Sequence, residues 1–246
     1  MERYYLIINI GSVVGSIFLL YLYWKKSGGW KKTAVVFLIS LLLLEVGNFG
    51  GKLVRVLSYG EGVRIWELIT QEHGTHFIGR VIFTVLGFPW IYRLVYRNSK
   101  REWMEYLDLL CIFLAIQHIF NRMACLSYGC CMGKFYDGPF AFRYFGEGSG
   151  AGYSFSVYPT QLFEIACMVG LTVLLLILRH RKKRLLFVFC FGFSLSIFLS
   201  EFMMENQGAI RIFGLSVIQY AALVLAGIAG IYFIAVRKGK YCPFEQ

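Results

Sequence analysis

Residues 106–121 of this chain, YLDLLCIFLAIQHIFN, form an apolar run close to the length of a helix that crosses a bilayer. The run shows no alternation of apolar and polar residues with a period of two, so it predicts a helix and not a strand. Arg122 follows directly and therefore lies at the rim of the membrane, where an arginine is costly without a partner or a function. The stretch indicates a membrane helix that ends at a polar site.

The composition of the whole chain agrees with this interpretation. Of its 246 residues, 58% are hydrophobic and 16% are charged, whereas soluble proteins carry about 25% charged residues. We therefore predict an all-α, polytopic membrane protein with about seven transmembrane helices, forming a single domain over residues 1–246. The predicted helices cover 4–24, 33–49, 77–96, 106–121, 159–178, 185–204 and 212–236.

The basic residues are concentrated after the first, third, fifth and seventh apolar runs. Because lysine and arginine gather on the cytoplasmic side of membrane proteins, the N-terminus is expected outside and the C-terminus in the cytoplasm. The net charge of +11 is then a topology signal and a contact surface for anionic lipid. No basic–aromatic pattern typical of nucleic-acid binding accompanies it. We therefore expect no nucleic-acid partner.

In this orientation the longest loop, at about 126–158, lies on the outer face. Asp137, Gly138 and Pro139 form a turn signal. The alternating aromatic residues from Phe140 to Tyr144 predict a short strand, and the glycines between 146 and 152 predict a mobile flap. The other outer loops are expected at 50–76, with a short amphipathic helix, and at 205–211.

Arg122, Gln161 and Glu164 are the first candidate site residues. Arginine presents a rigid fork of donors that suits a phosphate, and the small residues after Arg122 leave room for a ligand; a simple interfacial anchor is the alternative. Gln161 and Glu164 share a helical face, and Glu164 is expected to pair with Arg122 or Arg80, either to join helices or to orient the arginine. Further charged residues at membrane depth imply a polar cavity: Glu45, Arg80 and Glu201.

The cysteines and histidines admit several interpretations. Cys125, Cys130 and Cys131, which follow His118, are compatible with a metal cluster, a disulfide or small packing residues. Adjacent cysteines depart from the usual zinc spacing of two to four intervening residues, so we favour packing and expect neither a metal nor a cofactor. His76, near the start of the third run with His73, is a candidate general base, and an ordinary interfacial pair is the alternative.

The stretches NRMACLSYGCCMGK (121–134) and YPTQLFE (158–164) resemble the two motifs of the prolipoprotein diacylglyceryl transferases. In that family a central motif that reads roughly Gly-Arg-x-Gly-Asn-Phe-x-Asn-Gly-Glu-x-x-Gly-Arg is followed by His-Pro-Ser-Gln-Leu-Tyr-Glu. The chain looks closest to the branch with Gly-Cys-Cys-x-Gly in place of Gly-Glu-x-x-Gly. The matching residues are Arg122, Gly129, Gly133, Pro159, Gln161, Leu162 and Glu164, with Lys134 as a conservative match.

This resemblance implies a multi-pass enzyme of the bacterial inner, or plasma, membrane that needs no cofactor. Its reaction would transfer the diacylglyceryl group of phosphatidylglycerol to a cysteine thiol of a prolipoprotein or related peptide, at the outer face of the membrane. The catalytic residues would be Arg122, Glu164 and His76. The substrate-binding residues would be Arg122, Lys134, Arg143, Tyr158 and Gln161.

The chain also departs from the family pattern. Ile78 stands at the position of the family's histidine, and Met204 at the position of its second important arginine, which Arg211 is a candidate to replace. These departures favour a second hypothesis, a non-catalytic or repurposed membrane paralogue that binds phospholipid. A transporter is disfavoured because the chain has no repeated half.

Overall fold

The structure, a computed structural model, describes residues 2–27, 29–60, 62, 75–95, 100–143, 156–180, 185–205 and 208–237. Within these residues it contains seven helices and one antiparallel two-stranded sheet. In chain order the elements are α1 (Glu2–Ser27), α2 (Trp30–Tyr59), α4 (Phe77–Val95), α5 (Lys100–Tyr128), α6 (Thr160–His180), α7 (Leu186–Met203), β1 (Arg211–Ile212), β2 (Leu215–Ser216) and α8 (Val217–Arg237).

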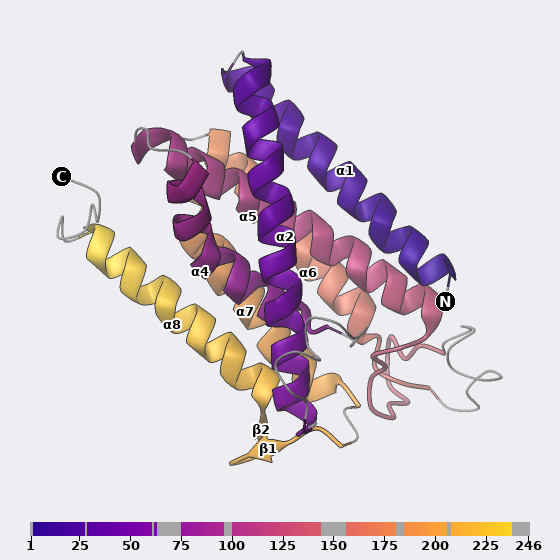
Figure 1. Cartoon of the computed structure of the whole chain (residues 1–246). Helices are drawn as coiled ribbons and strands as arrows, with labels where there is room; N and C mark the ends of the chain where they lie inside the picture. The colour runs from indigo at the N-terminus through magenta and orange to yellow at the C-terminus, as the bar shows by residue number, and fades with distance from the viewer. Residues whose placement is uncertain are drawn as a thin grey trace.

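The helices form a bundle of membrane-spanning length. Five of them are long and apolar enough to cross a bilayer, and α4 and α8 contain the shorter apolar stretches Phe77–Tyr92 and Val217–Ile231. The prediction of an all-α, polytopic membrane protein is therefore confirmed. Figure 1 shows that α1 begins at one end of the bundle and α8 ends at the opposite end, as an odd number of crossings requires.

Two helices extend beyond the apolar runs that predicted them. Residue 49 was the expected end of α2, but α2 continues to Tyr59 and stops at Gly60, whose left-handed φ of 66° lets its N–H reach the carbonyl of Val56. α5 likewise continues past Arg122 to Tyr128. The loops predicted to begin at residues 50 and 126 therefore begin later. Polar residues mark the depth at which a helix leaves the apolar layer, but they do not end its hydrogen-bond ladder.

Small residues set the closest helix contacts. A Cβ atom on Gly79 of α4 would overlap the backbone of Gly50 of α2, so these helices pack with their backbones in near contact. A Cβ atom on Gly11 of α1 would overlap Phe120 of α5. These contacts place α2 against α4 and α1 against α5.

The chain that follows α5 is bound on two sides. The N–H of Lys134 donates to the carbonyl of Met203 at 2.8 Å, and the carbonyl of Lys134 accepts from the N–H of Tyr158 at 3.1 Å. A Cβ atom on Gly133 would overlap the carbonyl oxygen of Tyr158, so this approach requires glycine. Residues 132–136 are thus held between the end of α7 and the start of α6.

The outer-loop predictions are tested only in part. The turn signal is confirmed, since the N–H of Ala141 donates to the carbonyl of Gly138 at 3.1 Å. In place of the expected strand from 140 to 144, the described residues show isolated bridges of Phe135 and Phe142 with Val157. Several predicted features lie outside the described residues: His73, Tyr144, the glycine flap at 146–152 and the amphipathic helix in the loop after α2.

Candidate functional site

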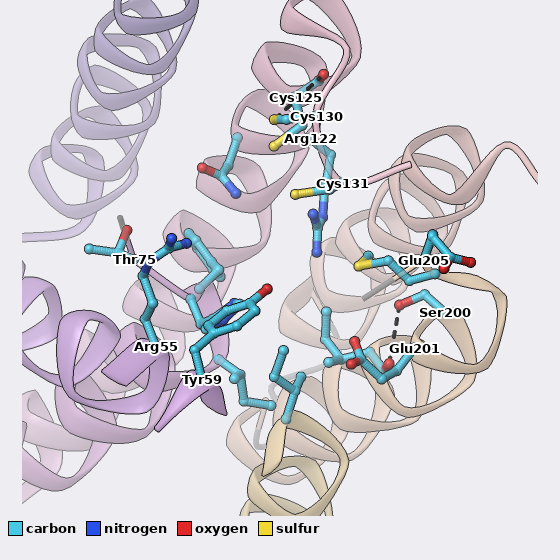
Figure 2. Close-up of a pocket in the computed structure, with 17 residues that line it drawn as sticks. Arg55, Tyr59, Thr75, Arg122, Cys125, Cys130, Cys131, Ser200, Glu201 and Glu205 are labelled. Atoms are coloured by element: carbon cyan, nitrogen blue, oxygen red, sulfur yellow. Dashed lines mark hydrogen bonds between the residues drawn. The ribbon is translucent and has the colours of Figure 1, made fainter. Parts of the chain in front are cut away.

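A pocket of about 340 Å³ lies at the end of the bundle where α1 begins. Its wall is built from the ends of α2, α5 and α7, the starts of α4 and α8, and the segment that follows α5. Figure 2 shows the three thiols and Arg122 on one side, Arg55 and Tyr59 on another, and Glu201 and Glu205 across from them. The charged and thiol-bearing lining residues are Arg55, Arg122, Glu201, Glu205, Cys125, Cys130 and Cys131.

A buried carboxylate orients Arg122. Its Nε donates to Oε2 of Glu164 at 2.7 Å, and Nε2 of His118 contacts the same oxygen at 2.8 Å. Glu164 and His118 are fully buried, whereas 12% of the Arg122 side chain is exposed. Because Nε is used in this pair, the terminal nitrogens of Arg122 are directed to the pocket that the residue lines.

This arrangement settles two sequence-based alternatives. Glu164 pairs with Arg122, which was one of its two predicted partners. The sequence left open a metal cluster that includes His118 beside the cysteines. In the structure the Nε2 of His118 contacts Glu164, and the group of possible metal ligands among the described residues contains only the three cysteines. His118 and Arg122 lie four residues apart on α5 and so share one helical face, a spacing that offered a signal for a joint contact.

The start of α6 supports the segment that carries two of the thiols. Gln161 donates from Nε2 to the carbonyl of Cys130, and the hydroxyl of Thr160 donates to the carbonyl of Cys131 at 2.9 Å. Both side chains are fully buried. Gln161, predicted to bind substrate, therefore contacts the backbone of a pocket residue and does not itself line the pocket.

His76 lies where the sequence placed it, at the entrance of α4 and on the pocket wall. Its ring stacks on Tyr59 with centroids 6.0 Å apart, and its N–H group in the backbone donates to the carbonyl of Gly51 at 3.0 Å. Burial lowers the pKa of His76 to about 4, so the imidazole is neutral at physiological pH. Among the described residues, its buried Nε2 has no hydrogen-bond partner.

The remaining predicted substrate contacts lie outside the pocket wall. Lys134 and Tyr158 are half-buried, and Arg143 is exposed. Tyr158 stacks on Tyr136 with centroids 4.0 Å apart. The structure therefore brings Arg122 and His76 together on one pocket wall, with Glu164 buried against Arg122. It places Lys134, Arg143 and Tyr158 outside that wall.

Arg55 is a pocket residue that no sequence pattern indicated. It lies on the part of α2 beyond the predicted apolar run, and its guanidinium lies 5.2 Å from the ring centre of Tyr59. Ile78 and Met204, the two departures from the family pattern, also line the pocket, whereas Arg211 lies exposed on β1 outside its wall. The second cation of the pocket is thus supplied by Arg55.

The charged residues expected at membrane depth do not all share one cavity. Glu201 lines the pocket with Arg122. Arg80 donates from a terminal nitrogen to the hydroxyl of Thr75 at 2.8 Å and is not part of the pocket wall, and neither is Glu45. The predicted polar cavity exists, but it is built from a different set of charges.

The sulfur atoms of Cys125, Cys130 and Cys131 all lie within 4.8 Å of one another. Cys125 is buried in the last turns of α5, Cys130 is half-buried, and Cys131 is exposed. Hydrogen bonds from the Cys125 and Cys130 thiols hold the pKa of Cys131 well below its usual value. The pocket thus carries a cluster of thiols next to an arginine.

Comparisons with known proteins indicate the family of this chain. Residues 1–237 match the family described as prolipoprotein diacylglyceryl transferase. The chain is 25% identical over 214 residues to phosphatidylglycerol–prolipoprotein diacylglyceryl transferase 2 of Clostridium perfringens (strain 13 / Type A), which covers 83% of this chain and 80% of that protein.

Two enzymes of Helicobacter pylori with the name phosphatidylglycerol–prolipoprotein diacylglyceryl transferase are also similar. The protein of strain ATCC 700392 / 26695 is 26% identical over 260 residues, covering 100% of this chain and 79% of that protein. The protein of strain G27 is 28% identical over 177 residues, covering 66% of this chain and 59% of that protein.

Proposed function

This chain belongs to the prolipoprotein diacylglyceryl transferase family, and from this membership we propose how its pocket performs the reaction. The chain is a multi-pass membrane transferase that moves the diacylglyceryl group of phosphatidylglycerol to a prolipoprotein. The acceptor atom is proposed to be the sulfur of a cysteine in the prolipoprotein or in a related peptide. One C–O bond to the phosphate breaks, one C–S bond forms, and glycerol phosphate leaves with the electron pair while the thiol loses its proton.

Arg122 is proposed to bind the phosphate that becomes the leaving group. Negative charge grows on that phosphate as the C–O bond breaks, and a positioned cation stabilises the transition state more than the ground state. The observation that carries this proposal is the pair of contacts on Glu164. One buried carboxylate oxygen binds both Arg122 and His118, so the guanidinium is fixed before substrate arrives.

Arg55 is proposed as the second cation at the phosphate. It lines the same pocket from the facing helix α2, so the two guanidinium groups approach the cavity from different sides. Two cations compensate for the position where the family pattern has an arginine and this chain has Met204. Lys134, Arg143 and Tyr158 remain predicted substrate contacts outside the pocket, on the segments that lead to it.

His76 is proposed to receive a hydrogen bond from the acceptor thiol. Its imidazole is neutral because burial lowers its pKa to about 4, so a ring nitrogen offers a lone pair. A pKa this low makes His76 a weak base, and its contribution is to orient the thiol. A catalytic role is thus retained for His76, together with Arg122 and Glu164.

The reaction is proposed to take place at the outer face of the bacterial plasma membrane. The pocket lies at the end of the bundle where α1 begins. The segments rich in lysine and arginine follow α1, α4, α6 and α8, and these helices end at the opposite side of the bundle. The positive-inside rule puts that basic side in the cytoplasm. The whole chain, residues 1–246, is proposed to act as a single domain.

Transfer measured with purified protein tests the proposed function. The chain in detergent, with phosphatidylglycerol and a synthetic peptide that carries one acceptor cysteine, should form a peptide whose mass is increased by a diacylglyceryl group. A peptide with serine in place of the cysteine is the control. Growth of a bacterium depleted of its own diacylglyceryl transferase should also be restored by this chain.

A second candidate function is supported by two apolar pocket residues. Ile78 and Met204 line the cavity at positions where the family pattern is polar, which favours a paralogue that binds phosphatidylglycerol without transferring its lipid. The same experiment separates the two functions. Saturable binding of phosphatidylglycerol with no lipidated peptide and no restored growth would establish the binding protein and reject the transferase.

A further inference from the structure

We propose that Cys125, Cys130 and Cys131 together bind one zinc ion, and that the acceptor thiol completes its coordination during transfer. This inference rests on the proposed function and concerns the same pocket. In this proposal all three thiols bind the same ion, a role that neither core packing nor a disulfide would give them. The close approach of three sulfur atoms outweighs the preference for packing that the sequence spacing alone indicated.

The distances fit a zinc ion. Its bonds to thiolate sulfur are about 2.3 Å long, so two sulfurs on a tetrahedral ion lie roughly 3.8 Å apart. The three sulfurs here lie within 4.8 Å of one another, and a shift of less than about 1 Å per side chain would close the triangle around the ion. Cys125 and Cys130 are separated by four residues, which is within the usual spacing of zinc ligands.

The backbone is shaped to bring the third sulfur to the other two. α5 ends at Tyr128, and Gly129 and Cys131 adopt left-handed φ angles of 75° and 58°. A left-handed conformation is unfavourable for a residue with a side chain, so Cys131 is held in it by its surroundings. The buried side chains of Thr160 and Gln161 supply that support through the carbonyls of Cys131 and Cys130.

The exposure of the thiols argues against packing as their role. A cysteine that only fills the core is buried, as Cys111 and Cys190 are in this protein. Cys131 is exposed, Cys130 is half-buried, and both line the pocket with Cys125. A disulfide would use two of the sulfurs and leave the third beside it without a bond, whereas one zinc ion uses all three.

The proposed ion has a direct chemical use in this pocket. Three thiolates occupy three positions of a tetrahedral zinc ion, and the fourth is available to the acceptor thiol, whose sulfur loses its proton to water on coordination. The coordinated sulfur then forms the C–S bond, glycerol phosphate leaves with the electrons of the C–O bond, and zinc changes neither its charge nor its protein ligands. No oxidant or reductant is needed.

Zinc content tests the site independently of activity. Full-length protein purified in detergent without chelator should contain about one zinc ion per chain by mass spectrometry of its metals. Cys131→Ser and Cys130→Ser should each lower that content at least tenfold. Cys167→Ser, which changes a half-buried cysteine of α6 outside the cluster, is the matched control and should keep the metal.

Folding is checked so that each result can be assigned. Cys131 is exposed, so Cys131→Ser should keep the melting temperature of the protein measured with a chelator present. Zinc retained by Cys131→Ser and by Cys130→Ser would overturn the proposal. Wild-type protein without zinc would also overturn the proposal. That outcome includes protein whose mass is lower by about 2 Da because two thiols of the cluster have lost their hydrogens and formed a disulfide.

Cobalt substitution tests the contact with the acceptor. Protein loaded with Co²⁺ in place of zinc should show thiolate-to-cobalt absorption that increases when the cysteine peptide is added, and not when the serine peptide is added. Unchanged absorption with the cysteine peptide would overturn the role of the ion in binding the acceptor.

The two proposals fail in different ways. If zinc and cobalt behave as expected but no peptide is lipidated, the transferase proposal fails and the thiol-binding zinc site stands. If peptide is lipidated at the wild-type rate by metal-free protein and by Cys131→Ser, the proposed role of the ion in transfer fails and the transferase stands.

Discussion

Replacing Arg122 separates its catalytic role from its structural one. In Arg122→Lys the charge is kept, but one ammonium group cannot both bind Glu164, now 2.7 Å from Nε, and present two terminal nitrogens to a phosphate. We expect kcat/KM for phosphatidylglycerol to fall at least tenfold, which corresponds to about 1.4 kcal/mol of lost transition-state stabilisation. In Arg122→Ala the loss should reach roughly 100- to 1000-fold, as when a preorganised donor is removed from a developing anion.

Stability should respond differently from activity. Removing one partner of a buried ion pair costs about 3–5 kcal/mol because the other charge is left buried. Glu164 keeps its contact with His118 at 2.8 Å, so the loss in Arg122→Ala should lie below that range. Adding Glu164→Gln removes the buried charge. The double variant should therefore regain melting temperature in detergent without regaining transfer.

The assay is lipidation of the cysteine peptide, followed by mass, with thermal unfolding of the same samples. Arg211→Lys is the matched control, because Arg211 lies exposed on β1 outside the pocket wall and should give the wild-type rate. If the variant with both Arg122→Ala and Glu164→Gln transfers lipid at the wild-type rate, Arg122 is only an interfacial anchor and the phosphate site lies elsewhere.

Three further predictions concern the pocket, the support of its segment and the topology. Arg55→Ala should raise KM for phosphatidylglycerol about tenfold or more while the melting temperature stays unchanged, since Arg55 lines the pocket and Glu164 keeps its partners. Gly133→Ala should lower the free energy of unfolding by about 1–3 kcal/mol because its Cβ would overlap a backbone carbonyl. A Cβ at Gly170 meets nothing within 4 Å, so Gly170→Ala should leave that free energy unchanged. Chemical denaturation of the two variants measures the difference. The topology is tested in a variant with Cys130 and Cys131 replaced by serine. A cysteine introduced at Phe135, which is 67% exposed, should react with a membrane-impermeant thiol reagent in intact cells, whereas a cysteine introduced at Ser27 should not. The reverse result would invert the proposed orientation.

The helices were predictable because a segment that crosses the apolar layer of a membrane must itself carry apolar side chains. Their lengths were not, as α2 and α5 show. Polar residues such as Asn48 and Arg122 signal the edge of the apolar layer, yet both lie inside helices whose hydrogen bonds continue. A helix that projects beyond the apolar layer keeps its backbone groups paired, so sequence hydropathy reports depth and not helix length.

The parts of the site that follow from the chemistry of single side chains were predictable from the sequence. The parts that depend on where the tertiary fold places distant residues were not. The pairing of Arg122 with Glu164 follows from the cost of burying either charge alone. Arg55 was missed because its helix was expected to end before it. The meeting of the three thiols depends on the turn of the chain at Gly129, whose left-handed conformation the sequence permits but does not require.

The shared oxygen of Glu164 restricts how this chain can evolve. Because Arg122 and His118 contact the same carboxylate oxygen from one face of α5, a neutral residue at position 164 would leave a buried cation without its counter-charge. Losing Arg122 first would leave the buried carboxylate with only an imidazole. Single changes at these positions should therefore be costly, and we expect relatives to differ at them together, as a linked set.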